Sequence, residues 1–202
     1  MNGYIKMLDF DLLLQIWGGT GYLLAKLLLA IAEGVDNGRK WRIVGWFSYL
    51  LGIPAWVILL VSKNNWVIAA NDIGCIPSMI LGIITAWKQN HQANKIYEKF
   101  VKFFTVFMII MGTSYSIYYF RGITTISQVL EILVIIGFLS GSYLLAKNNH
   151  NGWLLFALMC VSIVILMAIQ GKTLLAIMQA ISIIIVIIGY IRAKKRIKYA
   201  HQ

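Results

Sequence analysis

Four polar side chains interrupt long apolar stretches of this chain, and their chemistry is the first thing to explain. Asn71 and Asp72 stand side by side in the stretch 66–87, Glu131 stands in 125–146, and Gln179 stands in 173–192. An ionisable group inside a membrane-spanning segment is costly and by default marks a functional site. Carboxylates and amides can bind a cationic or hydrogen-bonding solute, so a substrate-binding or gating role is the first hypothesis.

All four residues fall in the same outer third of their stretches, at about 1.5 Å per residue, so they could ring one cavity. The alternative is that some of them lie at the level of the lipid headgroups or pair with one another structurally. Gln15, Trp17 and Gln128 are weaker candidates. They stand near helix starts, which often hold polar and aromatic anchors.

The elements that must position these side chains are membrane helices. Hydrophobic residues make up 60% of the 202 residues and charged residues 12%, against about 25% charged in a soluble domain. A helix needs about 20 apolar residues to cross a bilayer. Seven stretches meet this length: 12–32, 43–62, 66–87, 101–120, 125–146, 152–170 and 173–192. The sequence therefore predicts an all-α membrane protein with seven transmembrane helices.

Cationic residues assign the two sides of the membrane, because cytoplasmic loops carry an excess of Lys and Arg. The side with the N-terminus holds Lys6, Lys63, Arg121 and Lys172. The other side holds Arg39, Lys40, Arg42, Lys88, Lys95, Lys99, Lys102, Lys147, Arg192, Lys194, Lys195, Arg196 and Lys198. Lys26 is left over, near the inner end of the first span. We expect the N-terminus outside and the C-terminus in the cytoplasm.

The net charge of +11 does not indicate nucleic acid, because the charges lie between apolar stretches and not on a soluble face. The basic tail 194–202 is interpreted as a topology anchor or a contact with anionic lipids.

A repeated motif divides the chain. Residues 21–26 read Gly-Tyr-Leu-Leu-Ala-Lys, and residues 142–147 read Ser-Tyr-Leu-Leu-Ala-Lys. Gly45-Trp46 recurs as Gly152-Trp153 and Gly82 recurs as Gly189, both 107 positions later. The same offset places Gln179 at the repeat position of Asp72. Weak internal repeats of hydrophobic helices are typical of small-molecule transporters.

The repeat predicts two parallel three-helix units joined by a linking helix, because one extra span restores the direction of the second unit. Such a three-plus-one-plus-three arrangement is known in sugar-transporter folds of this size. The predicted single transmembrane domain comprises repeat one at about 10–88, a linker helix at about 100–121 and repeat two at about 125–193.

Several residues have two interpretations. Trp46 and Trp153 are first read as anchors at the cytoplasmic interface, and second as an aromatic wall for a planar ligand. Gly137 and Gly141 have the spacing of a close helix contact, within the chain or between copies in a homo-oligomer. Pro54 and Pro77 can each bend a helix, as a hinge or as a static kink.

No catalytic constellation is visible in the sequence. The chain lacks a P-loop, a glycine-rich dinucleotide turn and a defensible Ser/His/Asp set. Cys75 and Cys160 both lie in apolar stretches and are read as small buried hydrophobes. We expect no enzyme activity, no cofactor and no transport driven by ATP hydrolysis in this chain.

Residues 131–195 resemble the PnuC family of bacterial vitamin transporters. The resemblance comprises Glu131, the run Tyr143-Leu-Leu-Ala-Lys147, Trp153-Leu-Leu, the turn Gly171-Lys-Thr-Leu-Leu-Ala176, and Gly189 with the basic tail. It implies a location in the bacterial inner membrane and facilitated diffusion of nicotinamide riboside or a similar nucleoside-like vitamin precursor, which a separate kinase traps in the cell. The Trp-x-x-Trp pattern of the family reads Trp153-x-x-Phe156 here, which implies that these two rings contact the substrate.

Three alternatives stay open from the sequence. The solute could be another small metabolite, the protein could be a non-transporting membrane scaffold or assembly factor, or it could be a semi-selective channel. The expected partners are a small-molecule substrate and membrane lipids, and the glycines permit a homo-oligomer.

Overall fold

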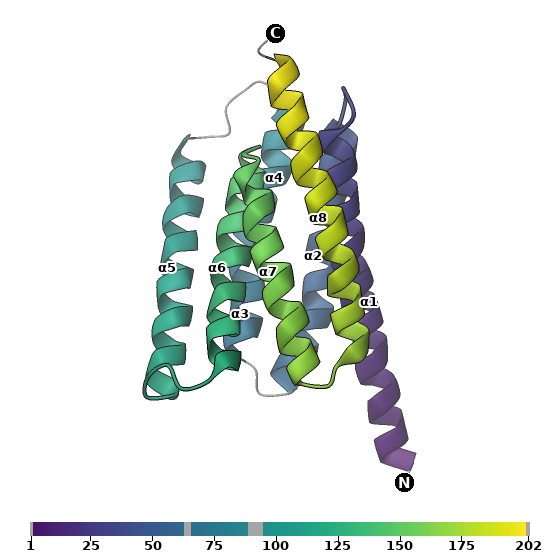
Figure 1. The fold of residues 1–202 in the computed structure, drawn as a ribbon, viewed down its shortest axis with the longest axis vertical. Coiled ribbons are helices and arrows are strands. Elements are labelled where there is room, and N and C mark those ends of the chain that lie inside the picture. The colour runs from purple at the N-terminus through teal and green to yellow at the C-terminus, as the bar shows by residue number, and fades with distance from the viewer. Residues whose placement is uncertain (1, 63–65, 89–94, 201–202) are drawn as a thin grey trace.

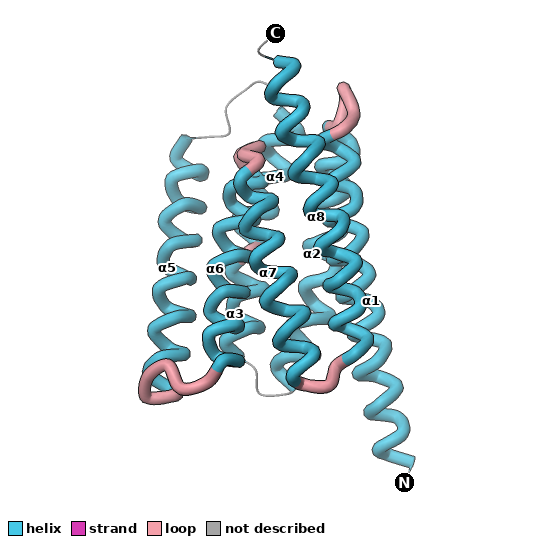
Figure 2. The backbone as a smooth tube through the Cα atoms, in the orientation of Figure 1, coloured by secondary structure: helices cyan, strands magenta, loops and turns pink. Residues whose placement is uncertain are grey.

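The structure is a computed structural model that describes residues 2–62, 66–88 and 95–200. These residues form helices joined by short turns (Figure 2). The helices are α1 (Asn2–Glu33), α2 (Arg39–Ser62), α3 (Trp66–Gly74), α4 (Ile76–Lys88), α5 (Lys95–Tyr119), α6 (Ile126–Ala146), α7 (Asn151–Ile169) and α8 (Thr173–Ala200). Among the described residues, seven segments are long and apolar enough to cross a membrane, with α3 and α4 together supplying the third. The prediction of an all-α seven-helix membrane protein is confirmed.

A break divides the third span immediately after Asn71 and Asp72. Cys75 forms a turn between α3 and α4, and its amide reaches the carbonyl oxygens of both Asn71 and Asp72 at 3.2 Å. Pro77 explains the break, because it has no N–H to donate to the preceding turn. Pro54, by contrast, lies inside a continuous α2.

Helix α5 stands at the edge of the bundle (Figure 1). Helix α1 packs against α2 and α8, while α6 packs against α7, α5 and α4. The α5 side chains Phe103 and Tyr118 are 72% and 84% exposed, which fits contact with lipid. The two ends of the chain lie at opposite ends of the bundle (Figure 1), as an odd number of spans requires.

Two buried tryptophans occupy equivalent places, each against a glycine of the next span. A Cβ atom on Gly82 would lie 2.4 Å from the indole of Trp46, and one on Gly189 would lie 2.8 Å from the indole of Trp153. Trp46 and Trp153 are only 2% and 1% exposed. Their interpretation as interface anchors is therefore wrong: the missing glycine side chains leave room for the rings inside the bundle.

Gly137 and Gly141 also pack within the chain. A Cβ atom on Gly137 would lie 2.8 Å from the Leu155 carbonyl oxygen, and one on Gly141 would lie 2.5 Å from the ring of Phe156. The close glycine face of α6 is thus used against α7, which leaves it unavailable for a contact between copies.

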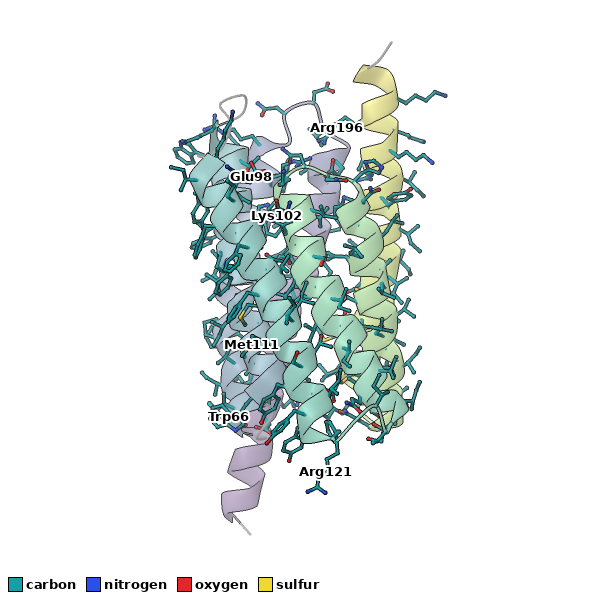
Figure 3. The ribbon with its side chains drawn as sticks, turned by 90° about the vertical axis from the view of Figure 1, so that its left-hand side faces the viewer. Trp66, Glu98, Lys102, Met111, Arg121 and Arg196 are labelled. Carbon is teal, nitrogen blue, oxygen red and sulfur yellow. The ribbon has the colours of Figure 1, made fainter. Side chains whose placement is uncertain are left out.

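Charged side chains gather at the C-terminal end of the bundle, where Glu98, Lys102 and Arg196 lie, and Arg121 lies at the opposite end (Figure 3). Lys102 and Arg196 thus lie at one end and Arg121 at the other, as expected from the sequence. Lys63 lies outside the described residues. An ion network ties this C-terminal end together. The Glu33 carboxylate on α1 contacts Arg42 of α2 at 2.9 Å and Arg196 of α8 at 3.0 Å.

Candidate functional site

A cavity of about 120 Å³ lies between the helices, in the half of the bundle where α2 and α7 end and where α3, α6 and α8 begin. Its walls come from α1, α2, α3, α6, α7 and α8. The polar residues that line it are Gln15, Tyr22, Lys26, Asn71, Asp72, Glu131, Gln170, Lys172 and Gln179. The four polar residues singled out from the sequence thus meet at one cavity, on three different helices. Their role in binding a substrate is a further step, argued below.

Asn71 presents polar atoms that no described residue satisfies. The residue is 3% exposed, and neither its amide nitrogen nor its amide oxygen has a hydrogen-bond partner among the described residues. The Trp56 indole nitrogen, which also belongs to the cavity lining, is buried without a partner as well. Buried polar groups in proteins are nearly always hydrogen-bonded, so these atoms around a cavity need an explanation. A polar solute in the cavity would supply the missing partners.

Two carboxyl groups face the same space. Asp72 on α3 is 6% exposed and lies beside the Tyr22 hydroxyl of α1. Glu131 on α6 is partly buried. Among the described residues, no ion pair joins either carboxyl group to a cation. A cationic group on a solute is the complementary charge for this side of the cavity.

Lys26 is one of four polar lining residues that sequence reasoning missed; the others are Tyr22, Gln170 and Lys172. Lys26 is 1% exposed, and its Nζ donates hydrogen bonds to Gln179 Oε1 at 3.1 Å, Ser182 Oγ at 3.1 Å and Cys160 Sγ at 3.6 Å. These acceptors lie on α7 and α8. The lysine therefore links the wall of α1 to the last two helices of the chain.

Helix α1 continues beyond Lys26 for seven residues to Glu33, which is about 10 Å of helix. The burial of Lys26 at the cavity is what the sequence did not predict. Its counterpart in the repeat, Lys147, follows the last residue of α6 and pairs with Glu98 at 2.5 Å on the surface. One signal could have found Lys26: it stands four residues after Tyr22 and so shares a helix face with it.

Trp153 and Phe156 do not line the cavity. Trp153 covers Gly189, and Phe156 is fully buried in a group of four rings, Tyr22, Tyr49, Phe138 and Phe156. We call this group the aromatic floor. Its ring centroids lie between 5.0 and 6.2 Å apart. Tyr22 and Phe138 also belong to the cavity lining, so the aromatic floor borders the cavity.

Of the three weaker candidates from the sequence, one lines the cavity and two lie elsewhere. Gln15 lines the cavity, whereas Trp17 is 48% exposed on the outside of the bundle. Gln128 is buried, but its amide nitrogen donates to the carbonyl oxygens of Ser116 and Gly122. It therefore holds the turn between α5 and α6.

No metal-binding group of three or more His, Cys, Asp or Glu side chains occurs in the described part of the chain. No family model, no curated protein and no solved structure matches this chain.

Proposed function

We propose that this chain is a membrane transporter that carries nicotinamide riboside, or a similar nucleoside-like vitamin precursor, by facilitated diffusion. The observation that carries the proposal is the cavity in which Asn71, Asp72, Glu131 and Gln179 meet. A membrane scaffold gains nothing from unpartnered polar atoms inside its bundle, whereas a carrier needs them to replace the hydration of its solute. The acidic pair Asp72 and Glu131 suits a pyridinium cation.

We also propose that the chain consists of two related three-helix units joined by a linking helix. Two equivalent tryptophan–glycine contacts, Trp46 on Gly82 and Trp153 on Gly189, support two related units, with α5 as the linking helix. Carriers built from repeats place the substrate between them and expose it alternately to the two sides. The cavity draws its walls from both units.

Alternating access requires a barrier on the closed side. In this structure the barrier comprises the aromatic floor and, beyond it, the ion network of Glu33 with Arg42 and Arg196. The network joins α1 and α2 of the first unit to α8 of the second. We infer that these ion pairs break when the cavity opens toward the C-terminal end.

A smaller metabolite is the second candidate solute, and the cavity volume favours it. Small-molecule sites commonly measure about 300–1,000 Å³, and this cavity measures about 120 Å³. A nucleoside would require the helices around the cavity to move apart, whereas a single pyridinium ring requires much less movement.

Uptake into proteoliposomes tests the proposal. Vesicles that contain the purified chain should take up labelled nicotinamide riboside saturably, without ATP, until the concentrations inside and outside are equal. Empty vesicles are the control. A rate that rises linearly with concentration would indicate a channel, and no uptake above the control for any nucleoside or pyridinium compound would contradict a transport function.

A further inference from the structure

Lys26 brings a positive charge to a cavity that the sequence predicted to be acidic. Its ammonium group is buried in the wall, and its three hydrogen bonds go to an amide oxygen, a hydroxyl and a thiol. These acceptors satisfy its three N–H donors, but all three are neutral. Among the described residues, no ion pair joins Lys26 to a carboxylate.

An ammonium group inside the membrane normally has a counter-charge, because an unpaired buried charge is strongly unfavourable. The other lysine of the repeat, Lys147, has a carboxylate partner, Glu98, although it lies on the surface. The acidic residues of the cavity, Asp72 and Glu131, lie on α3 and α6, whereas the Lys26 ammonium is held against α7 and α8. The cavity thus carries opposite charges on different walls.

We propose that Lys26 makes this site selective for dipolar solutes, which carry a carboxylate or similar anion in addition to a cationic group. The anion would take the place of the missing counter-charge at Lys26, and the cationic group would face Asp72 and Glu131. The inference rests on the proposed transport function and narrows its substrate class to solutes that carry an anion, which nicotinamide riboside lacks. Charge-assisted hydrogen bonds are the strong ones, so a solute with both groups should bind at least about tenfold more tightly than one with the cation alone.

Two probes of nearly equal size separate these cases. N-methylnicotinate carries a pyridinium ring and a carboxylate, whereas N-methylnicotinamide carries the same ring with a neutral amide. Binding of each to the full chain in lipid nanodiscs can be measured by titration calorimetry. We expect tighter binding of the carboxylate probe to the wild-type protein. Binding of neither probe, or binding of the amide probe as tightly as the carboxylate probe, would overturn the inference.

The lysine itself is tested by Lys26→Met, which keeps the length of the side chain and removes the charge. The preference for the carboxylate probe should disappear in this variant and persist in the matched control Lys147→Met. A second variant, Gln179→Glu, keeps the lysine and places a carboxylate at its partner position. Gln179→Glu should also abolish the preference for the carboxylate probe. It tests the role of Lys26 even if Lys26→Met does not fold. If either variant folds and still prefers the carboxylate probe, the proposed role of Lys26 is overturned.

Uptake distinguishes failure of this inference from failure of the transport function. Saturable uptake of nicotinamide riboside with no preference for the carboxylate probe would contradict the selectivity assigned to Lys26 and would still support the transport function. Preferential binding of the carboxylate probe with no uptake of any solute would support the binding site and contradict the transport function.

Discussion

The ammonium of Lys26 on α1 donates a hydrogen bond to the side-chain oxygen of Gln179 on α8, over 3.1 Å. The contact joins the first helix of the chain to the last one at the wall of the polar cavity. Gln179 is also the residue that follows Asp72 by the repeat offset of 107 positions. One position of the repeated sequence therefore carries an acid in α3 and, in α8, an amide that holds a lysine.

Replacing Gln179 by leucine should destabilise the bundle. Lys26 would lose one of its three acceptors while remaining buried, at a cost of about 1–3 kcal/mol. The expected result is a lower midpoint of thermal unfolding for Gln179→Leu in detergent. An unchanged midpoint would mean that the contact contributes nothing to the fold.

Asn71→Leu should have the opposite effect on stability. Both polar atoms of the Asn71 amide are buried without a partner, and an apolar side chain of similar size removes this unfavourable burial. The unfolding midpoint should stay equal or rise. A clear fall would show that Asn71 holds the fold together, and its assignment to solute binding would lose its basis.

Gly82→Ala should strain the contact with Trp46, because the added Cβ atom would lie 2.4 Å from the ring. Overpacking of this kind costs about 1–3 kcal/mol, measured as a lower unfolding midpoint. Gly112→Ala is the matched control, since its nearest neighbour would be an ordinary contact at 3.4 Å with Ile135. Equal midpoints for the two variants would contradict the tight packing of Trp46.

Glu33→Gln should weaken the C-terminal end of the bundle. The change leaves Arg42, whose side chain is 11% exposed, without its carboxylate, and breaking a buried pair costs about 3–5 kcal/mol. Glu98→Gln breaks the exposed pair with Lys147 and should cost less than about 1 kcal/mol. The difference is measured as the fall in the thermal unfolding midpoint of each variant. Similar falls would contradict a larger contribution of the Glu33 network to stability.

The helices were predictable from the sequence because apolar runs of membrane length leave little choice of structure. The break at Cys75 was less predictable, since Pro54 sits in a continuous helix and Pro77 does not. Whether a proline interrupts a helix depends on the neighbours that receive the freed backbone groups, and these come from other parts of the fold.

The sequence predicted the acidic residues and most of the amide residues of the cavity, but it did not predict Lys26. Asp72 and Glu131 stood out because charges are rare in such stretches. Lys26 resembled Lys147 in its motif, and only the length of α1 and the acceptors on α7 and α8 distinguish the two. The position of Trp153 was not predictable either, because it depends on the contact with Gly189, a residue from a different helix.

The most direct test of the central claim is uptake of labelled nicotinamide riboside into proteoliposomes by the wild-type chain and by Asn71→Leu, with equal amounts of folded protein. We predict saturable uptake by the wild type and a loss of about tenfold or more in the variant, because a polar contact inside the cavity is removed. Equal uptake by the two proteins, or no saturable uptake by either, would contradict solute transport through this cavity.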